Sequence, residues 1–578
     1  MQFAEILYNY TADTLKKLAR LCDCTPYGRK DELVRCIHRT MMKPDSLRQL
    51  WSRLDDLSKK AVATAYHNDG EFSQTAFIAQ YGSAPARPKD RWGWYQEPIL
   101  LDLFIHDKHL PADLMPLLAD LVPPPDRFQL TGLAETPKTA KVGKTPVDLT
   151  CAETEQAGLH DLLAYLRLVD QGKIKISATS SRATGGSLKK LLTNLLVGDF
   201  LLPPENFRAT NTIRPFGLDV FAQEAGLVTK ARGRDELELS EAGREFYQTR
   251  RPDLLLEVFE TWTQQGQFDE LTRISGLKGL GSRGTHLTQA AARREAVIEA
   301  LSWCPAGVWI DIKDFYRALK IWHFDFEVET SQYSNLYVGP YRDYGGLYGD
   351  AYWLATKGLY VNTVLWEYLG TIGALDLLYT DPDDADLIVL DFYYDDYISL
   401  YDGLRYFRIN PLGAYLLGQA GEYIPSQPPD RALFAIDADL QLTLTGDLTP
   451  NDRSLLAQVA VTAGQGRYRL DTVTLLTALE DGAVFDHLAD FLRRHHTGPL
   501  PAAASAWLDN ILANSLAFSK GDSALLIRVA TPELADLALA DPTLRPLCDR
   551  LNSKTLVVPT RKEKAFRARL KELGYILQ

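Results

Sequence analysis

The sequence predicts an α+β, mainly helical protein built from several domains. Its 578 residues suggest about four domains at roughly 150 residues each. Segments with apolar residues at helical spacing alternate with short apolar or β-branched runs. Two stretches without apolar periodicity, 135–148 and 418–431, predict a flexible segment or long loop and a linker. The predicted domains are 1–44, 45–134, 149–250, 251–420 and 432–578.

Composition and charge limit the classes of function. Apolar residues make up 46% of the chain and charged residues 24%, which is typical of a folded protein with sizeable cores. We expect no membrane span, because no run of 18 apolar residues occurs, and no signal peptide. Six cysteines are too few for a disulfide framework, so we expect reduced thiols in a cytoplasmic protein. The net charge of −12 means that any nucleic-acid contact must come from local basic patches.

The first 44 residues predict two short helices around a basic loop. Leu15, Leu18 and Leu21 form one apolar stripe, and a second helix begins at Asp31 with Leu33 inward. The pattern resembles the SAP motif, a small DNA-binding helical hairpin, except that Asp23-Cys24 stands where the motif has Gly-Leu. A loop before a helix lets backbone N–H groups and cationic side chains meet a phosphate together. The predicted DNA contacts are Lys16, Lys17, Arg20, Tyr27, Gly28, Arg29 and Lys30. A plain hairpin with a solvated basic face is the alternative.

Residues 45–134 predict further helices. Leu47, Leu50, Leu54 and Leu57 have the spacing of one amphipathic helix, and residues 58–82 follow as helix, turn and helix. This order is compatible with a first winged-helix-like unit.

The middle of the chain predicts tandem winged-helix units. A helix at "LHDLLAYLRLVDQG" precedes a strand at 173–177, a loop, and a helix capped by Ser187. The same theme recurs at "CPAGVWIDIKDFYRAL" and "LRYFRINPLGAYLLG", the second unit carrying a Tyr/Gly-rich insert at 331–353. A later helix of such a unit can enter a DNA groove. The predicted contacts of the first unit are Lys173, Lys175, Arg182, Lys189 and Lys190. The equal alternative is a winged helix used for protein contact.

The last 147 residues predict an α/β domain. The run at 524–529 predicts a strand, followed by a helix with Thr531 as N-cap and Pro532 at its first position. A second strand at 555–558 precedes a helix at 561–573 with one basic face, and residues 575–577 can return as a strand. With "LTLTGDLTPNDRSLLAQVA" and "TLVVPTRKEKAFRARLKELGYIL", residues 432–578 resemble the N-terminal domain of XPB-type DNA helicases, which in bacteria also occurs on chains without the motor. The resemblance implies a helicase-associated, DNA-facing module and carries over no catalytic residue.

No motif predicts catalysis, a metal or a cofactor. Cys22, Cys24, Cys36 and His38 lack a common zinc spacing. The glycine run 276–284 lacks the lysine of a phosphate-binding loop. Eight aspartates between 381 and 402 predict a solvated acidic loop, with an acidic docking surface or a two-metal nuclease as alternatives. The histidines at 495–496 are better interpreted as the cationic end of a helix than as a metal ligand or a general base.

The sequence therefore predicts a non-enzymatic, DNA-binding accessory or adaptor subunit. It would work with a separately encoded helicase or nuclease in DNA repair or antiviral defence. The alternative is a protein–protein scaffold of such a complex that does not itself bind DNA, which the net charge favours.

Overall fold

The computed structural model describes residues 2–89, 96–142, 145–201, 208–249, 251–330, 335–338, 349–384, 398–426, 432–448, 450–480, 485–515, 517 and 524–577. It is a mixed α/β structure with small antiparallel sheets. The chain forms two compact units. One comprises Met1–Asp430 with Leu448–Leu456 and Glu480–Val484, and the other comprises Arg431–Asp447, Ala457–Leu479 and Phe485–Gln578.

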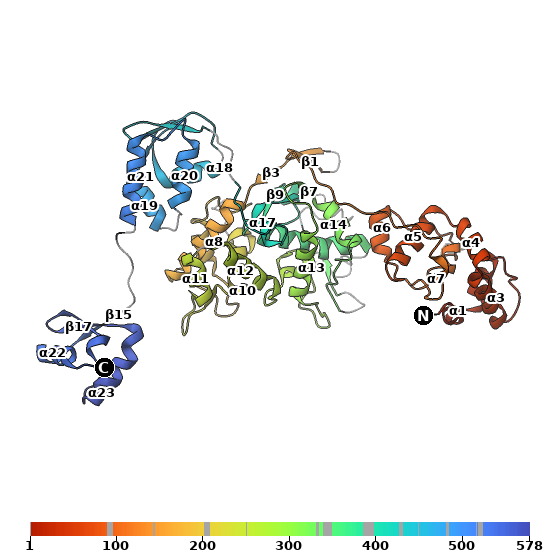
Figure 1. The fold of residues 1–578 in the computed structure, drawn as a ribbon, viewed down its shortest axis with the longest axis horizontal. Helices are drawn as coiled ribbons and strands as arrows, with labels where there is room; N and C mark the ends of the chain where they lie inside the picture. The colour runs from red at the N-terminus through yellow and green to blue at the C-terminus, as the bar shows by residue number, and fades with distance from the viewer. Residues whose placement is uncertain are drawn as a thin grey trace. The chain divides into compact units, whose positions relative to one another are not determined.

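The first 122 residues form a helical module with a core of its own (Figure 1). Its elements are α1 (Phe3–Asn9), α2 (Ala12–Leu21), α3 (Lys30–Met42), α4 (Pro44–Arg53), α5 (Asp56–His67), α6 (Gln74–Tyr81), η1 (Leu100–Leu103) and α7 (Met115–Leu118). The hydroxyl of Thr11 accepts from the N–H of Thr14 and caps the start of α2. The leucines expected in one helix are divided instead: Leu47 and Leu50 lie in α4, Leu54 follows it, and Leu57 lies in α5. The Asp55 carboxylate accepts from the N–H of Ser58 and so caps the start of α5. The described part of 45–134 contains isolated bridges but no extended strand, so a winged-helix order is not seen there.

The expectation that all thiols are reduced is wrong for two cysteines. Cys24, which follows α2, forms a disulfide with Cys36 on α3, their Cα atoms being 6.2 Å apart. Two residues of the possible zinc set are therefore joined to each other. The bond ties the basic loop to the helix that follows it. Cys22, Cys151, Cys304 and Cys548 are free.

The middle of the chain has one hydrophobic core, which runs from Leu130 to Leu417. The predicted domains 149–250 and 251–420 share that core and a sheet with strand order β3–β9–β10–β7. The elements up to residue 302 are β1 (Thr139–Val142), β2 (Thr145–Asp148), β3 (Thr150–Ala152), α8 (Glu155–Asp170), α9 (Gly185–Leu192), η3 (Ala209–Asn211), α10 (Arg214–Glu224), β4 (Val228–Lys230), β5 (Leu237–Leu239), α11 (Glu241–Thr249), α12 (Pro252–Gln264), η4 (Glu270–Arg273), β6 (Leu277–Lys278) and α13 (Ala290–Ser302).

The remaining elements of the middle follow the same alternation. They are β7 (Trp309–Asp311), α14 (Ile312–Ile321), β8 (Tyr337–Val338), α15 (Gly349–Trp353), the π-helical η5 (Leu354–Gly358), α16 (Leu359–Thr363), the π-helical η6 (Val364–Gly370), β9 (Leu375–Tyr379), η7 (Pro382–Asp384), β10 (Leu404–Ile409) and α17 (Pro411–Leu416). We call residues 349–370 the composite helix. Asn410 caps α17 and Pro411 occupies its first position, as the sequence predicts.

Two segments of the middle repeat one order of elements, helix, strand, helix, helix and β-hairpin. The first repeat comprises α8, residues 174–176, α9, α10, β4 and β5. The second comprises α13, β7, α14, the composite helix, β9 and β10. In each repeat, the last strand lies between the other two. In the first repeat, β5 pairs with β4, and residues 235–237 at its start bond to residues 174–176. In the second, β10 lies between β7 and β9. The strand expected at 173–177 is reduced to two isolated bridges, at Lys175 and Ile176.

Two local predictions of the first repeat are wrong. Residues 139–148, expected to be flexible, form the hairpin β1–β2, in which Val142 pairs with Thr145 across a two-residue connection. The N-cap of α9 is Thr184, not Ser187, because the Thr184 hydroxyl accepts from the N–H of Ser187 three residues later.

The residues after 431 form two further groups of elements. The first contains β11 (Phe434–Ile436), β12 (Gln441–Leu444), α18 (Pro450–Val459), β13 (Ala460–Gly464), β14 (Arg467–Leu470), α19 (Thr472–Glu480), α20 (Phe485–His495) and α21 (Ala502–Ser515). The second contains β15 (Ala524–Arg528), α22 (Pro532–Ala540), η8 (Arg545–Leu547), β16 (Asp549–Asn552), β17 (Thr555–Pro559), η9 (Thr560–Lys562) and α23 (Glu563–Glu572).

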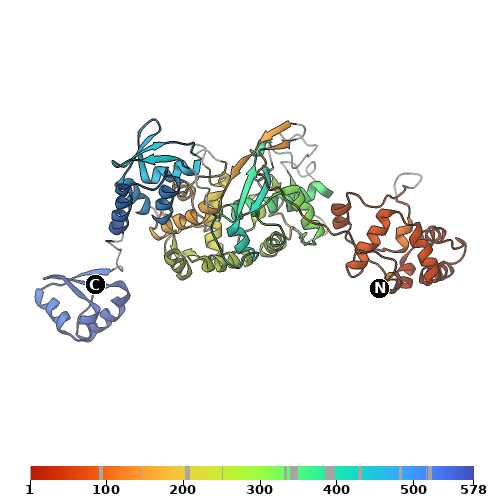
Figure 2. The same cartoon turned by 45° about the horizontal axis from the view of Figure 1, so that its top comes forward.

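The second group, residues 524–577, has its own core and a sheet of order β15–β17–β16 with α22 and α23 on one face (Figure 2). The predicted strand, helix, strand and helix are present. Strand β16 was not predicted, and residues 575–577 are not a strand. Among the described residues of the whole chain, no helix combines the length and the apolar character needed to cross a bilayer.

Candidate nucleic-acid interface

The predicted loop of the N-terminal module is exposed. The Tyr27 ring is 80% accessible, and the side chains of Arg29 and Lys30 face solvent. Gly28 has a φ of +138°, and the carboxylate of Glu32 accepts from the N–H of Arg29 at 2.9 Å, which fixes the start of α3. Lys30 Nζ donates to the carbonyl of Tyr8 at 2.6 Å. Neither cation forms an ion pair among the described residues, so both charges remain accessible to a phosphate.

Two of the three predicted contacts on α2 are paired with carboxylates. Lys16 forms an ion pair with Asp13 at 3.2 Å, and Lys17 forms one with Glu97 at 2.7 Å. Arg20 is exposed without an ion pair within the described part of the chain. Exposed pairs of this kind are weak, and a phosphate can displace the carboxylate. Arg20 is therefore the contact on α2 that the geometry favours.

A cationic groove lies between α1 and α3. It has a volume of about 600 Å³, and Ala4, Tyr8, Val34, Arg35, His38, Arg39, Met42 and Lys43 line it. None of these is acidic, although the whole chain has a net charge of −12. We call Lys30, Arg35, Arg39 and Lys43 the α3 cationic face. Arg39 and Lys43 are not among the contacts predicted from the sequence, although the four-residue spacing of 35, 39 and 43 favours one side of a helix.

The five predicted contacts of the first repeat do not form one surface. Lys173, Lys189 and Lys190 are exposed, but Lys175 forms an ion pair with Glu236. That pair holds the pKa of the Glu236 carboxyl below its usual value. Arg182 is engaged inside the fold: its side chain is only 18% accessible, lies 3.5 Å from Glu224 and stacks over Phe268. The structure therefore leaves Lys173, Lys189 and Lys190 available, and it removes Arg182 from any DNA-facing surface.

The helix expected to enter a DNA groove is buried in both repeats. Nine residues of α10 are buried, and so is every residue from 355 to 370 of the composite helix. The two helices pack against each other, and Gly217 lies so close that a Cβ added there would meet the carbonyl oxygen of Glu367. Neither of these two helices is therefore exposed for insertion into a major groove, because each covers the other.

Buried ion pairs fix this packing. Arg273 binds the Glu367 carboxylate at 2.7 Å and also donates to the carbonyl of Thr212, just before α10. Arg294 pairs with Glu270, which accepts from the hydroxyl of Tyr360 at 3.2 Å. Burial raises the pKa of the Glu367 carboxyl, while the Arg273 charge opposes that rise. Breaking a buried pair of this kind leaves an uncompensated charge, so the two repeats are held as one body.

The other motifs do not assemble a catalytic site within the described residues. No cluster of three His, Cys, Asp or Glu suited to a metal occurs there. Asp386, Asp391, Asp395 and Asp396 lie outside the described residues, whereas Asp381, Asp383 and Asp384 lie at η7 and Asp402 is buried. His495 ends α20 and packs on Phe491, and His496 bonds to the carbonyl of Gly498 at 3.0 Å. The glycine run 276–284 holds β6 and a turn.

Comparison of the sequence with protein-family models and with curated proteins finds no match.

Proposed function

We propose that this chain is a non-catalytic, DNA-binding accessory or adaptor subunit that works with a separately encoded helicase or nuclease in DNA repair or antiviral defence. The observation that carries the proposal is the α3 cationic face: Arg35, Arg39 and Lys43 line a groove whose described lining has no carboxylate, and Lys30 lies at the start of α3. Backbone phosphates supply most of the affinity of non-specific DNA binding, and such a row of cations suits them.

The proposal includes an architecture. The basic loop with α2 and α3 is proposed as a SAP-like hairpin, and the two repeats as tandem winged-helix units. Residues 432–578 are proposed as a domain like the N-terminal domain of XPB-type helicases. Its last 55 residues, 524–578, carry a separate core and the basic helix α23, and they are the proposed contact with the motor protein. The order of elements and the strand order of each repeat support the winged-helix assignment.

Charge reversal of two residues tests DNA binding. Each lost phosphate contact removes about 0.9 from the slope of log affinity against log salt, which is roughly fivefold in affinity at 0.15 M salt. For Arg35→Glu/Arg39→Glu we expect duplex affinity about thirtyfold lower and a slope smaller by about 1.8. Arg48→Glu/Lys554→Glu changes the net charge equally outside the α3 cationic face and is the control. Equal losses in both double variants would mean that only net charge matters.

A protein–protein scaffold is the second candidate, and one observation favours it. Both third helices, α10 and the composite helix, are buried, so neither repeat can read a DNA groove in the usual way. A scaffold would show no duplex binding at 0.15 M salt and would still capture its partner. Affinity purification with the full chain and with a chain ending at residue 517 measures this: loss of a helicase or nuclease with the shorter chain supports the adaptor arrangement.

A further inference from the structure

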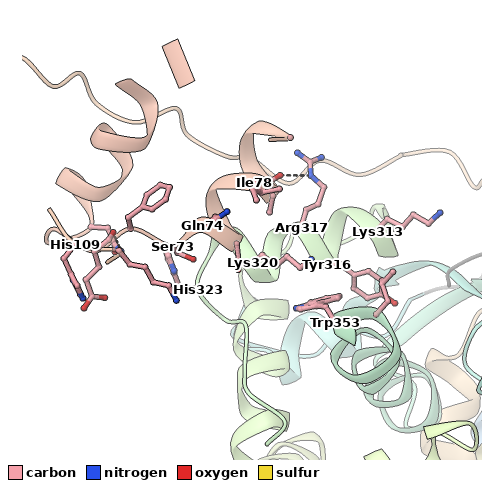
Figure 3. Close-up of a pocket in the computed structure, with 18 residues that line it drawn as sticks. Ser73, Gln74, Ile78, His109, Lys313, Tyr316, Arg317, Lys320, His323 and Trp353 are labelled. Atoms are coloured by element: carbon pink, nitrogen blue, oxygen red, sulfur yellow. Dashed lines mark hydrogen bonds between the residues drawn. The ribbon is translucent and has the colours of Figure 1, made fainter. Parts of the chain in front are cut away.

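A second cleft of the first unit lies between α6 and α14. We call it the α6–α14 cleft. Its volume is about 1080 Å³, at the upper end of the range for ligand pockets. One wall is α6 with the loop before it and the residues 108–109, and the other is α14 with His323 and Trp353 (Figure 3). Two segments more than 200 residues apart in the sequence therefore build one site.

The lining is strongly cationic. Lys108, Lys313, Arg317 and Lys320 are its cations, His109 and His323 lie beside them, and Glu71 is the one acidic residue among the described residues that line it. The cations come from both walls, so an anion between them is attracted from two sides. Cations gathered in a cleft raise the local concentration of an anionic ligand, even on a chain of net charge −12. This charge pattern indicates a ligand with several negative charges.

Two of the cations hold the cleft in shape. Arg317 Nε donates to the carbonyl of Ala79 at 3.1 Å and so ties α14 to α6. Lys320 Nζ lies 4.2 Å from the centre of the Trp353 ring, which packs edge-on against Tyr316 in the floor. The Arg317 bond thus joins the two walls without a ligand, which lowers the entropic cost of binding.

Two exposed residues of the lining have unusual backbone conformations. Lys108 has a φ of 70° and His323 a φ of 62°, both in the left-handed region that non-glycine residues seldom adopt. Such conformations cost about 1 kcal/mol or more each and occur most often at functional sites. The two residues stand on opposite walls of the cleft.

The spacing of the cations on α14 fits a chain of phosphates better than one phosphate. Lys313, Arg317 and Lys320 span seven residues of one helix, or about 10 Å at 1.5 Å per residue. That length exceeds a single phosphate, so the row can face successive phosphates of one strand. The cleft volume of about 1080 Å³ is too small to enclose a duplex.

We propose that the α6–α14 cleft binds a single strand of nucleic acid through its phosphates. This inference deepens the proposed function by naming the form of nucleic acid that the middle of the chain takes, while the α3 cationic face takes duplex. A basic cleft that follows the backbone is the usual design of sequence-independent single-strand binding. An adaptor with both surfaces would sit where a duplex opens.

The test compares two labelled ligands by fluorescence anisotropy on the full chain: a 15-nucleotide oligo(dT) and a 20-base-pair duplex, at 0.15 M salt. For Lys108→Glu/Lys313→Glu we expect oligo(dT) affinity about fifteenfold lower, since the slope per contact is about 0.7 for single strands. Duplex affinity should stay within twofold. Arg35→Glu/Arg39→Glu should show the opposite pattern, and Lys554→Glu/Arg48→Glu should change neither.

Several outcomes overturn the inference. Unchanged oligo(dT) affinity in Lys108→Glu/Lys313→Glu overturns it, and so does an equal loss for both ligands. Displacement of oligo(dT) by ATP at equal phosphate concentration would assign the cleft to a mononucleotide instead. If wild type binds oligo(dT) but not the duplex, the α3 cationic face fails while the cleft stands. Photocrosslinking of wild type with 4-thiothymidine in the oligo(dT) provides a check that needs no variant: crosslinks should map to residues 72–82 or 313–323, and crosslinks elsewhere alone would refute the assignment.

Discussion

Gly217→Ala tests the packing of the two repeats more sharply than any charge change. Local and tertiary effects have opposite signs at this position. In the interior of a helix, alanine is about 1 kcal/mol more favourable than glycine. Here, however, a Cβ at Gly217 would lie closer than 3.0 Å to the carbonyl oxygen of Glu367 on the facing helix. That oxygen belongs to the backbone, so no side-chain rotation can relieve the contact, and α10 must move away from the composite helix.

The magnitude follows from the two effects together. Overpacking a tight core costs about 1–3 kcal/mol, and the upper value applies because the clash is with backbone. Subtracting the helix gain of about 1 kcal/mol leaves a net loss of about 2 kcal/mol, or roughly 3 °C in Tm for a domain of this size. Gly186 on α9 is the matched control, since a Cβ there meets nothing within 4 Å. Gly186→Ala should leave stability unchanged or raise it by up to about 1 kcal/mol.

The assay combines thermal unfolding with hydrogen exchange read by mass spectrometry. Gly217→Ala should lower Tm and speed exchange in residues 214–224 and 355–370, with no change in residues 2–89. Duplex binding through the α3 cationic face should persist, because α3 packs in the separate core of the N-terminal module. If Gly217→Ala proves as stable as Gly186→Ala, the two third helices are not packed together, and the argument against groove insertion loses its basis.

Three further predictions concern buried or bonded groups. Burial lowers the pKa of His106 to about 4. Protonation therefore favours the unfolded N-terminal module as pH falls from about 6.5 to 4, by about 3 kcal/mol in total. Hydrogen exchange in the described residues between 2 and 122 should rise over this pH range, and His106→Asn should abolish that pH dependence. Burial raises the pKa of Asp402 to about 7, so stability falls progressively as pH rises from about 4 to 7. Asp402→Asn should raise Tm at pH 8 and not at pH 4. A rise at pH 4 would contradict this predicted pH dependence. Cys36→Ser removes a disulfide between residues 12 apart in sequence and should destabilise the N-terminal module by roughly 3 kcal/mol. Dithiothreitol should lower the Tm of wild type to that of the variant. A wild-type Tm that dithiothreitol leaves unchanged would show that the bond is absent.

The sequence by itself determined the features that depend on neighbours along the chain. Thr11 and Asn410 start helices where a short polar side chain precedes an apolar stripe, and Pro411 follows at the first position, because capping joins residues two or three apart. The repeated order of helices and strands in the middle also follows from local periodicity. The basic loop at Arg29 and Lys30 is exposed, as its composition predicts.

Only the tertiary structure decided which charges and helices meet a partner. Arg182 looks like a surface cation in the sequence, but Glu224 and Phe268 enclose it. Helix α10 faces the composite helix and not solvent, because two repeats placed in tandem cover each other's third helix. The disulfide of Cys24 and the cleft lined by Lys108 and Lys313 depend on how close separate segments come in space, which local sequence patterns do not determine. Periodicity reports one helix at a time, whereas burial, pairing and clefts arise from how distant helices pack, so these had to be seen in three dimensions.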